Sequence, residues 1–187
     1  LINRIPSDFM KVFTFDVVTK FFSVIISILI INILSTNDYA VYTKFSSIAS
    51  FILGVIGTGL SFSFVRIATE DVSRGKDTAF SLYKVCIILT IISFMIVFLF
   101  KRAIISLYSM GGLATLLSIL YGGVLSLNRM NQSYFQAKEK YTMSGIIDNI
   151  RNVVLCLALI ATLLFRGNIP INGLLYITII CMLVAYF

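Results

Sequence analysis

Long stretches without a charged residue are the feature that most constrains the fold of this chain. Four of them cover residues 45–65, 85–100, 103–128 and 167–187. Each approaches or exceeds the roughly 17–25 apolar residues that cross a bilayer as an α-helix, and none alternates as membrane β-strands do. With 59% hydrophobic and 12% charged residues, the chain also has too little polar surface for a soluble domain. The sequence therefore predicts an all-α bundle in a membrane.

Two further uncharged stretches, residues 21–37 and 152–165, are short for a span. A helix of that length crosses about 30 Å of hydrocarbon only if it borrows residues on its N-terminal side. The borrowed turns bring Asp16 and Lys20 to the first span, and Asp148 and Arg151 to the second. We therefore expect six helices, over residues 13–34, 42–64, 83–100, 103–127, 145–165 and 169–187.

The basic residues between these helices favour one orientation. Lys20 and Arg151 are set aside as intramembrane, and four cations then fall on the side away from the N-terminus: Lys44, Lys101, Arg102 and Arg166. Nine fall on the side of the N-terminus: Arg4, Lys11, Arg66, Arg74, Lys76, Lys84, Arg129, Lys138 and Lys140. This bias predicts a cytoplasmic N-terminus. Because the cations are spread over loops, the net charge of +7 does not indicate a nucleic-acid partner.

The residue types of the chain give little support for catalysis or for metal binding. The chain has no histidine, and Cys86, Cys156 and Cys181 fall in separate expected helices, without the close pairing of a zinc or redox site. We expect core cysteines, no metal, no cofactor and no enzymatic activity. The run GVIGTG at 54–59 lacks phosphate-loop spacing. Its small residues instead predict a seam for close helix packing, formed by Ser46, Ser50, Gly54 and Thr58.

A polar stripe enters the first helix. At about 100° per residue, Asp16, Lys20, Ser23 and Ser27 share a narrow sector of an otherwise apolar surface. Lipid does not accept such a stripe cheaply, so it should face protein or water, with Asp16 and Lys20 as a local ion pair. In the alternative interpretation, Lys20 snorkels to the head groups and Asp16 caps the helix.

Polar faces recur on two later helices. The fourth carries Gly111, Thr115, Ser118, Gly122, Ser126 and Arg129, and the fifth carries Ser144, Asp148, Arg151 and Asn152. We expect helices 1, 2, 4 and 5 to surround a polar, basic cavity that opens to the cytoplasm. Intramembrane charge of this kind is typical of the substrate path of transporters.

Two segments resemble a known family. The first is LSTNDYAVYTKFSSIASFILGVIGTGLSFSFVRIATED, residues 34–71, with its Asp38-Tyr39-Ala40 step, Gly59-Leu60 and Arg66-Ile67-Ala68. The second is NQSYFQAKEKYTMSGIIDNIRNVV, residues 131–154. Both are similar to segments of polysaccharide flippases of the O-antigen (Wzx-like) type, in the superfamily that also holds lipid II flippases and multidrug antiporters. The spacing agrees over essentially the whole chain.

The resemblance implies a bacterial inner-membrane transporter built of two six-helix lobes, with this chain as the first. Because the chain starts at Leu1 without a methionine and stops in an apolar run, we expect it to be a piece of a longer protein. The implied substrate is an undecaprenyl-diphosphate-linked oligosaccharide, such as an O-antigen, capsule or exopolysaccharide repeat unit. Membrane lipid, a C-terminal lobe, and polysaccharide polymerase and chain-length proteins are the expected partners.

The expected site follows from these two lines of reasoning. Lys20, Arg66, Arg129 and Arg151 are the candidate cations for a diphosphate. Asp16 and Asp148 are candidates for ion coupling, and the candidate polar lining is Ser23, Ser27, Ser118 and Asn152. Two alternatives remain open: a multidrug or cation antiporter, which favours an acidic cavity, and a non-transporting scaffold of a polysaccharide assembly complex, which needs no polar stripes.

Overall fold

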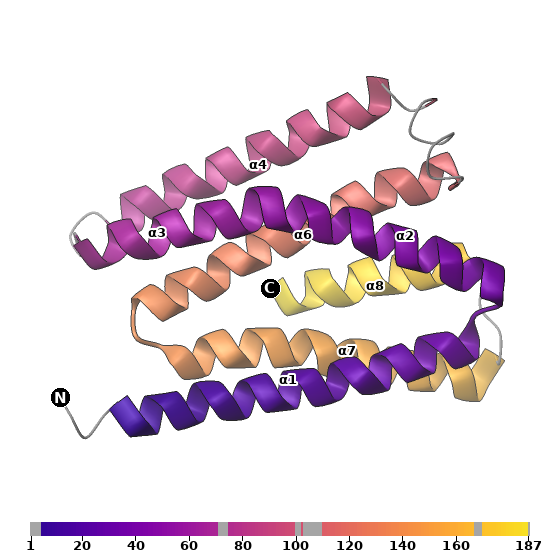
Figure 1. Ribbon diagram of the computed structural model, residues 1–187, viewed down its shortest axis with the longest axis horizontal. Helices are drawn as coiled ribbons and strands as arrows, with labels where there is room; N and C mark the ends of the chain where they lie inside the picture. The colour runs from indigo at the N-terminus through magenta and orange to yellow at the C-terminus, as the bar shows by residue number, and fades with distance from the viewer. Residues whose placement is uncertain (1–4, 71–74, 100–101, 103–109, 167–169, 187) are drawn as a thin grey trace.

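The structure is a computed structural model that describes residues 5–70, 75–99, 102, 110–166 and 170–186. Within these residues it is helical and contains no strand, which confirms the predicted all-α class. Figure 1 shows the long helices lying side by side. They are α1 (Ile5–Ile33), α2 (Thr36–Ile52), the π-helical segment η1 (Leu53–Thr58), α3 (Gly59–Glu70), α4 (Gly75–Leu99), α6 (Gly112–Ala137), α7 (Tyr141–Arg166) and α8 (Ile171–Tyr186).

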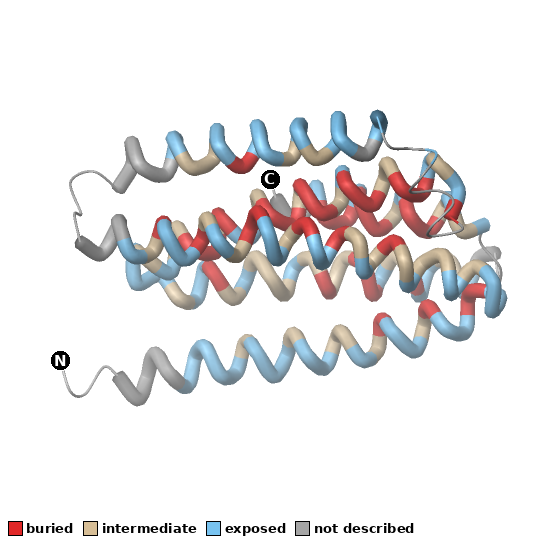
Figure 2. The backbone as a smooth tube through the Cα atoms, turned by 45° about the horizontal axis from the view of Figure 1, so that its top comes forward, coloured by how far each residue is buried: buried red, intermediate tan, exposed pale blue. Residues whose placement is uncertain are grey.

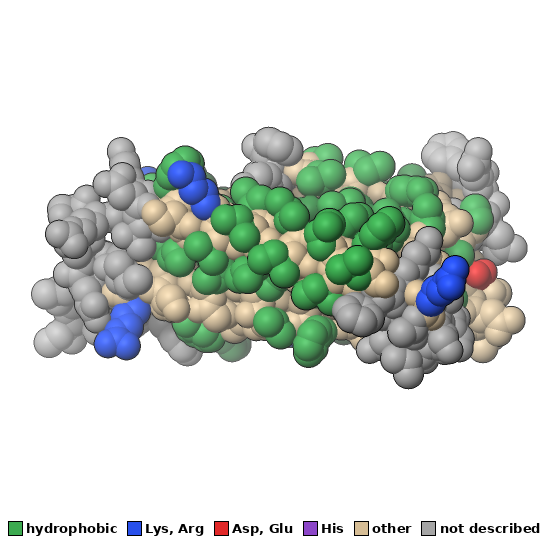
Figure 3. Space-filling view, turned by 90° about the horizontal axis from the view of Figure 1, so that it is seen from above, with side chains coloured by type: hydrophobic (Ala, Val, Ile, Leu, Met, Phe, Trp, Pro, Cys, Tyr) green, Lys and Arg blue, Asp and Glu red, His purple; other side chains and the backbone are tan. Residues whose placement is uncertain are grey.

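Four helical stretches in the described part of the chain are long and apolar enough to cross a membrane: Met10–Ile33, Thr36–Arg66, Gly112–Ala137 and Tyr141–Leu164. Two shorter apolar helices, Phe80–Ile96 and Ile171–Val184, run beside them. Hydrophobic side chains cover the middle of the face drawn in Figure 3, and basic side chains lie toward both ends. The chain is therefore a multi-pass membrane protein.

Several helices begin or end away from the expected positions. The second helical stretch starts at Thr36 rather than at residue 42. Ser35 is its N-cap, because the Ser35 hydroxyl oxygen accepts a hydrogen bond from the Asp38 amide at 3.2 Å. Lys44, near the start of the predicted helix 42–64, consequently lies well within α2. The expected helix 103–127 corresponds to α6, which starts at Gly112 and continues to Ala137; residues 103–109 of that prediction lie outside the described residues.

Two further helices also begin before their predicted starts, and two agree closely with the prediction. The first helix starts at Ile5 instead of 13, and α4 starts at Gly75 instead of 83. The predicted spans 145–165 and 169–187 correspond to α7 and α8, whose observed bounds differ by only a few residues. The added turns of both helices carry charged residues, and a span predicted from apolar length does not include such turns.

The bundle is organised around α6, which contacts α2, η1, α3, α4, α7 and α8 (Figure 1). α1 instead packs along α7. Its buried residues, Ile26, Ile30 and Ile33, lie in its C-terminal half and pack with Leu155 and Leu159 of α7. Figure 2 shows the resulting contrast, with the N-terminal part of α1 much more exposed than the centre of the bundle. The polar stripe predicted for the first helix begins in this exposed part of α1, where it can line a cavity.

Close packing between α2, η1 and α6 depends on two glycines. A Cβ at Gly122 would lie 2.9 Å from the Ala49 carbonyl oxygen, and one at Gly57 would lie 3.0 Å from the Ser126 Cα. The predicted seam is wrong for Gly54, which has nothing within 4 Å of an added Cβ. The repeat already faces away from α6 before the π-helical segment begins, because Ser50 is exposed whereas Phe45, Ala49 and Ile52 are the buried residues of α2.

The cysteine prediction is confirmed, since Cys86, Cys156 and Cys181 are all free and buried. α4 contributes few other buried side chains, and most of its large hydrophobic residues are exposed, including Ile87, Ile91 and Phe98. In a membrane this face of α4 meets lipid.

Candidate functional site

A cavity of about 390 Å³, here called the inner cavity, lies among α1, η1, α6 and α7. This volume is within the range of roughly 300–1,000 Å³ that is common for small-molecule sites. Its lining residues are Thr19, Lys20, Ser23, Leu53, Thr58, Leu125, Asn128, Arg129, Gln132, Asp148 and Arg151. The structure thus brings together five of the residues singled out in the sequence: Lys20, Ser23, Arg129, Asp148 and Arg151.

The charge of this lining is predominantly positive. Lys20, Arg129 and Arg151 are its cations, and Asp148 is the carboxylate among its described residues. All four lie within helical stretches long enough to cross the membrane. Positive charge in such a place is costly unless it is paired or solvated, and it attracts anions more strongly than it would in water.

Arg151 is held by two residues of its own helix. Its Nε and Nη2 donate to Asn152 Oδ1 at 3.1 and 3.0 Å, and Nη2 lies 3.9 Å from Asp148 Oδ1. Asn152 is buried, with 3% of its surface exposed, so it stands behind the arginine rather than lining the cavity. These bonds occupy one edge of the guanidinium, which leaves its Nη1 edge for another acceptor.

Arg129 is held by a neighbour one turn away. Its Nη1 donates to Gln132 Oε1 at 3.0 Å, and Gln132 is buried. Both residues belong to α6, whose unexpected length past residue 127 places them on a rigid helix instead of in a loop. Two of the three cations of the inner cavity therefore have an amide partner that orients them.

A side pocket of about 70 Å³ adjoins the inner cavity and shares Thr19, Arg129, Gln132 and Asp148 with it. Asp16 lines this side pocket, whereas Lys20 lines the inner cavity. No ion pair joins these two side chains in the described part of α1, so the expected local pair is absent. Each contributes its charge to its own pocket instead.

Three predicted site residues lie away from the inner cavity. Ser27 is exposed and donates to the Ser23 carbonyl oxygen at 2.9 Å, one turn beyond the lining. Ser118 is fully buried and donates to the Thr115 carbonyl oxygen at 2.7 Å, so it belongs to the packing of α6. Arg66 lies near the end of α3 and is exposed. None of the three is among the lining residues.

The sequence reading missed two lining residues, Asn128 and Gln132. They are four residues apart and so share one face of α6. A polar pair with this spacing beside Arg129 is the signal in the sequence. The expected helix ends at residue 127, so both positions fall outside it.

The wall between α1 and α7 depends on Gly145. A Cβ at this position would lie 2.4 Å from Phe15 Cγ, so the absence of a side chain lets Phe15 pack directly on α7. Asn149 adds a hydrogen bond across the same interface, from Nδ2 to the Phe15 carbonyl oxygen at 3.4 Å. This contact fixes the turn of α1 that precedes Thr19 and Lys20.

A metal site finds no support in the described residues, because they contain no group of three or more His, Cys, Asp or Glu side chains that could hold an ion. A scan against protein-family models found no match, and searches of curated proteins and of solved structures found no similar protein.

Proposed function

We propose that this chain is one lobe of a membrane transporter that moves a diphosphate-linked oligosaccharide across a bacterial inner membrane. The observation that carries the proposal is the inner cavity, in which Lys20, Arg129 and Arg151 meet inside membrane-spanning helices. A diphosphate is the anionic group that joins such a glycan to its lipid carrier. Charge-assisted hydrogen bonds from cations in a low-dielectric cavity are well suited to bind it.

The charge balance favours this substrate over a cationic drug. Three cations against one carboxylate make the inner cavity repel organic cations, and a cation antiporter needs the opposite sign. A scaffold without transport activity has no use for a lining that costs free energy to keep in the membrane. The proposal therefore ranks above both alternatives.

The volume of the inner cavity limits how much of the substrate it holds. About 390 Å³ accommodates the diphosphate and the sugar nearest to it, but not a complete oligosaccharide with its lipid. The rest of the substrate then extends beyond these helices, against a second lobe or into lipid. Asp148, 3.9 Å from Arg151, and Asp16 in the side pocket remain the candidates for ion coupling.

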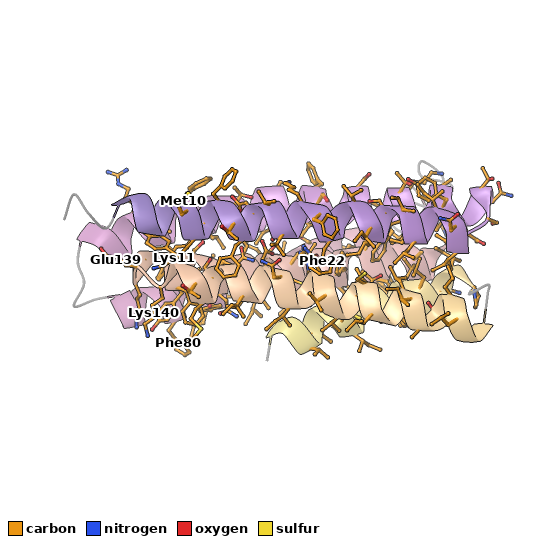
Figure 4. All side chains as sticks on the ribbon, turned by 90° about the horizontal axis from the view of Figure 1, so that it is seen from below. Met10, Lys11, Phe22, Phe80, Glu139 and Lys140 are labelled. Atoms are coloured by element: carbon orange, nitrogen blue, oxygen red, sulfur yellow. The ribbon has the colours of Figure 1, made fainter. Side chains whose placement is uncertain are left out.

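The proposed orientation places the N-terminus in the cytoplasm. Figure 4 shows Lys11 of α1 at the same end of the bundle as Glu139 and Lys140 of the α6–α7 turn. The expected positive bias of that end supports a cytoplasmic position. Loading from the cytoplasmic side then brings the diphosphate to the inner cavity.

Complementation tests the proposal. The gene for the full-length protein is deleted in its native strain, and surface polysaccharide is measured after the full-length protein is returned with or without substitutions. We expect the unsubstituted protein to restore polysaccharide. Lys20→Ala with Arg151→Ala should fail to do so, since the loss of a charged hydrogen bond typically costs about 1.5–3 kcal/mol, or roughly tenfold or more in binding per cation.

The matched control is Lys44→Ala, because Lys44 is a cation of α2 that lies outside the inner cavity lining. It should restore polysaccharide at the same membrane abundance. Normal polysaccharide from the double variant at normal abundance contradicts the cationic-cavity mechanism. Failure of the unsubstituted protein to restore polysaccharide contradicts the transport function itself.

A further inference from the structure

Asn128 lines the inner cavity, yet its side-chain carbonyl oxygen has no hydrogen-bond partner among the described residues. Only 2% of the residue is exposed, and its Oδ1 makes no hydrogen bond with any described residue. A buried polar atom without a partner normally costs about 1–3 kcal/mol. Such an atom at the wall of a cavity indicates a group that hydrogen-bonds to whatever enters the cavity.

Three other neutral polar residues of the lining already have a partner. Ser23 donates to the Thr19 carbonyl oxygen at 2.8 Å, and Thr58 donates to the Leu53 carbonyl oxygen at 3.3 Å. Gln132 Oε1 accepts from Arg129 at 3.0 Å. Asn128 differs from these residues because its buried carbonyl oxygen has no partner among the described residues.

The position of Asn128 relates it to the anion site. It precedes Arg129 on α6 and lines the same cavity as Lys20 and Arg151. A ligand whose anionic group contacts these cations therefore presents its adjoining atoms to the Asn128 amide. An amide of this kind accepts from a hydroxyl or an N–H group, and a bare diphosphate offers neither in its ionised form.

We propose that Asn128 is a specificity-determining residue that accepts a hydrogen bond from a hydroxyl or amide N–H on the sugar attached to the diphosphate. This inference rests on the proposed function. It means that the inner cavity distinguishes a carrier lipid with a sugar from the same lipid without one. A carrier that has already lost its glycan offers no sugar hydroxyl or amide N–H to the Asn128 oxygen.

The test measures binding of two probes to the purified full-length protein. One probe is a short-chain prenyl diphosphate, and the other is the same compound with one hexose on its terminal phosphate. We expect the unsubstituted protein to bind the glycosylated probe about tenfold more tightly, which is typical of one satisfied hydrogen bond in a buried site. In Asn128→Leu this preference should disappear, with the affinity for the bare probe unchanged.

Leucine has nearly the shape of asparagine. A loss of binding in Asn128→Leu can therefore be told apart from a loss of folding. Because it removes an unsatisfied buried amide, the variant should melt at the same temperature as the unsubstituted protein or higher. A markedly lower melting temperature means that the amide has a structural partner, and it overturns the inference. Equal affinities of the unsubstituted protein for both probes, or an equal loss of both in Asn128→Leu, also overturn it.

The variant Arg151→Ala shows whether a negative result concerns the specificity of Asn128 or the proposed function as a whole. The arginine is expected to bind the diphosphate, so its loss should weaken both probes to the same extent. If both probes bind and Arg151→Ala weakens both, while Asn128→Leu changes neither, only the specificity inference fails. If neither probe binds the unsubstituted protein, the proposed function fails and the inference fails with it.

Discussion

Arg151 donates two hydrogen bonds to one atom of its sequence neighbour, Asn152 Oδ1, from Nε at 3.1 Å and from Nη2 at 3.0 Å. Adjacent residues on a helix point about 100° apart and do not normally face each other. The arginine must therefore bend around the helix to reach its neighbour, which sets the direction of its free edge. Asn152 is buried, so this arrangement cannot be exchanged easily for water.

Asn152→Leu should lower transport by about tenfold, because an arginine that has lost its partner no longer presents a fixed edge to the diphosphate. Asn152 acts through Arg151 and does not line the inner cavity. The double variant Asn152→Leu with Arg151→Ala should consequently be no worse than Arg151→Ala alone. A double-mutant cycle of transport rates measures this, and fully additive losses would show that Asn152 acts independently of the arginine.

Single cysteines in a variant without native cysteines should report which face of α1 meets water. Lys20→Cys and Ser23→Cys line the inner cavity and should react with a small, charged thiol reagent. Val24→Cys should stay protected, since Val24 is exposed on an apolar part of α1 that meets lipid. Labelling is read by mass shift on a gel, and equal protection at all three positions contradicts a hydrated cavity.

Glycines on two packed helices should differ sharply in their tolerance of alanine. Gly122→Ala should lower the melting temperature, because the new Cβ would lie 2.8 Å from Ile52 Cβ and 2.9 Å from the Ala49 carbonyl oxygen. Gly54→Ala is the control, as nothing lies within 4 Å of its added Cβ. It should leave the melting temperature unchanged or raise it, since alanine favours helix by up to about 1 kcal/mol.

Thermal unfolding of the purified full-length protein in detergent measures both variants. Equal destabilisation by the two substitutions would show that the α2–α6 packing is not as close as described.

Helical periodicity was sufficient to predict that Lys20, Ser23, Asp148 and Arg151 face one space. These residues lie within regular helices, where a spacing of three or four residues fixes the direction of a side chain. The apolar stretches likewise predicted the membrane class. Both results depend on local geometry, which a single sequence contains.

The errors arose at one helix face and at helix boundaries. Small residues recur at Ser50 and Gly54, but Ala49 and Ile52 belong to the buried face of α2, and spacing alone does not say which face packs. The predicted end of the fourth helix at residue 127 leaves out Asn128 and Gln132, whereas α6 continues to Ala137. The Asp16–Lys20 spacing permits an ion pair, but each side chain lines a different pocket.

Transport by the full-length protein in liposomes tests the central claim most directly. A fluorescent prenyl-diphosphate hexose is placed in both leaflets, and its movement is followed by quenching from outside. The account predicts rapid movement with the unsubstituted protein and a rate reduced by about tenfold or more in Arg151→Ala, from the loss of a charged hydrogen bond. Lys44→Ala should move the lipid at the unsubstituted rate. Movement that is as fast in Arg151→Ala as in the unsubstituted protein would contradict the claim that the inner cavity binds the diphosphate.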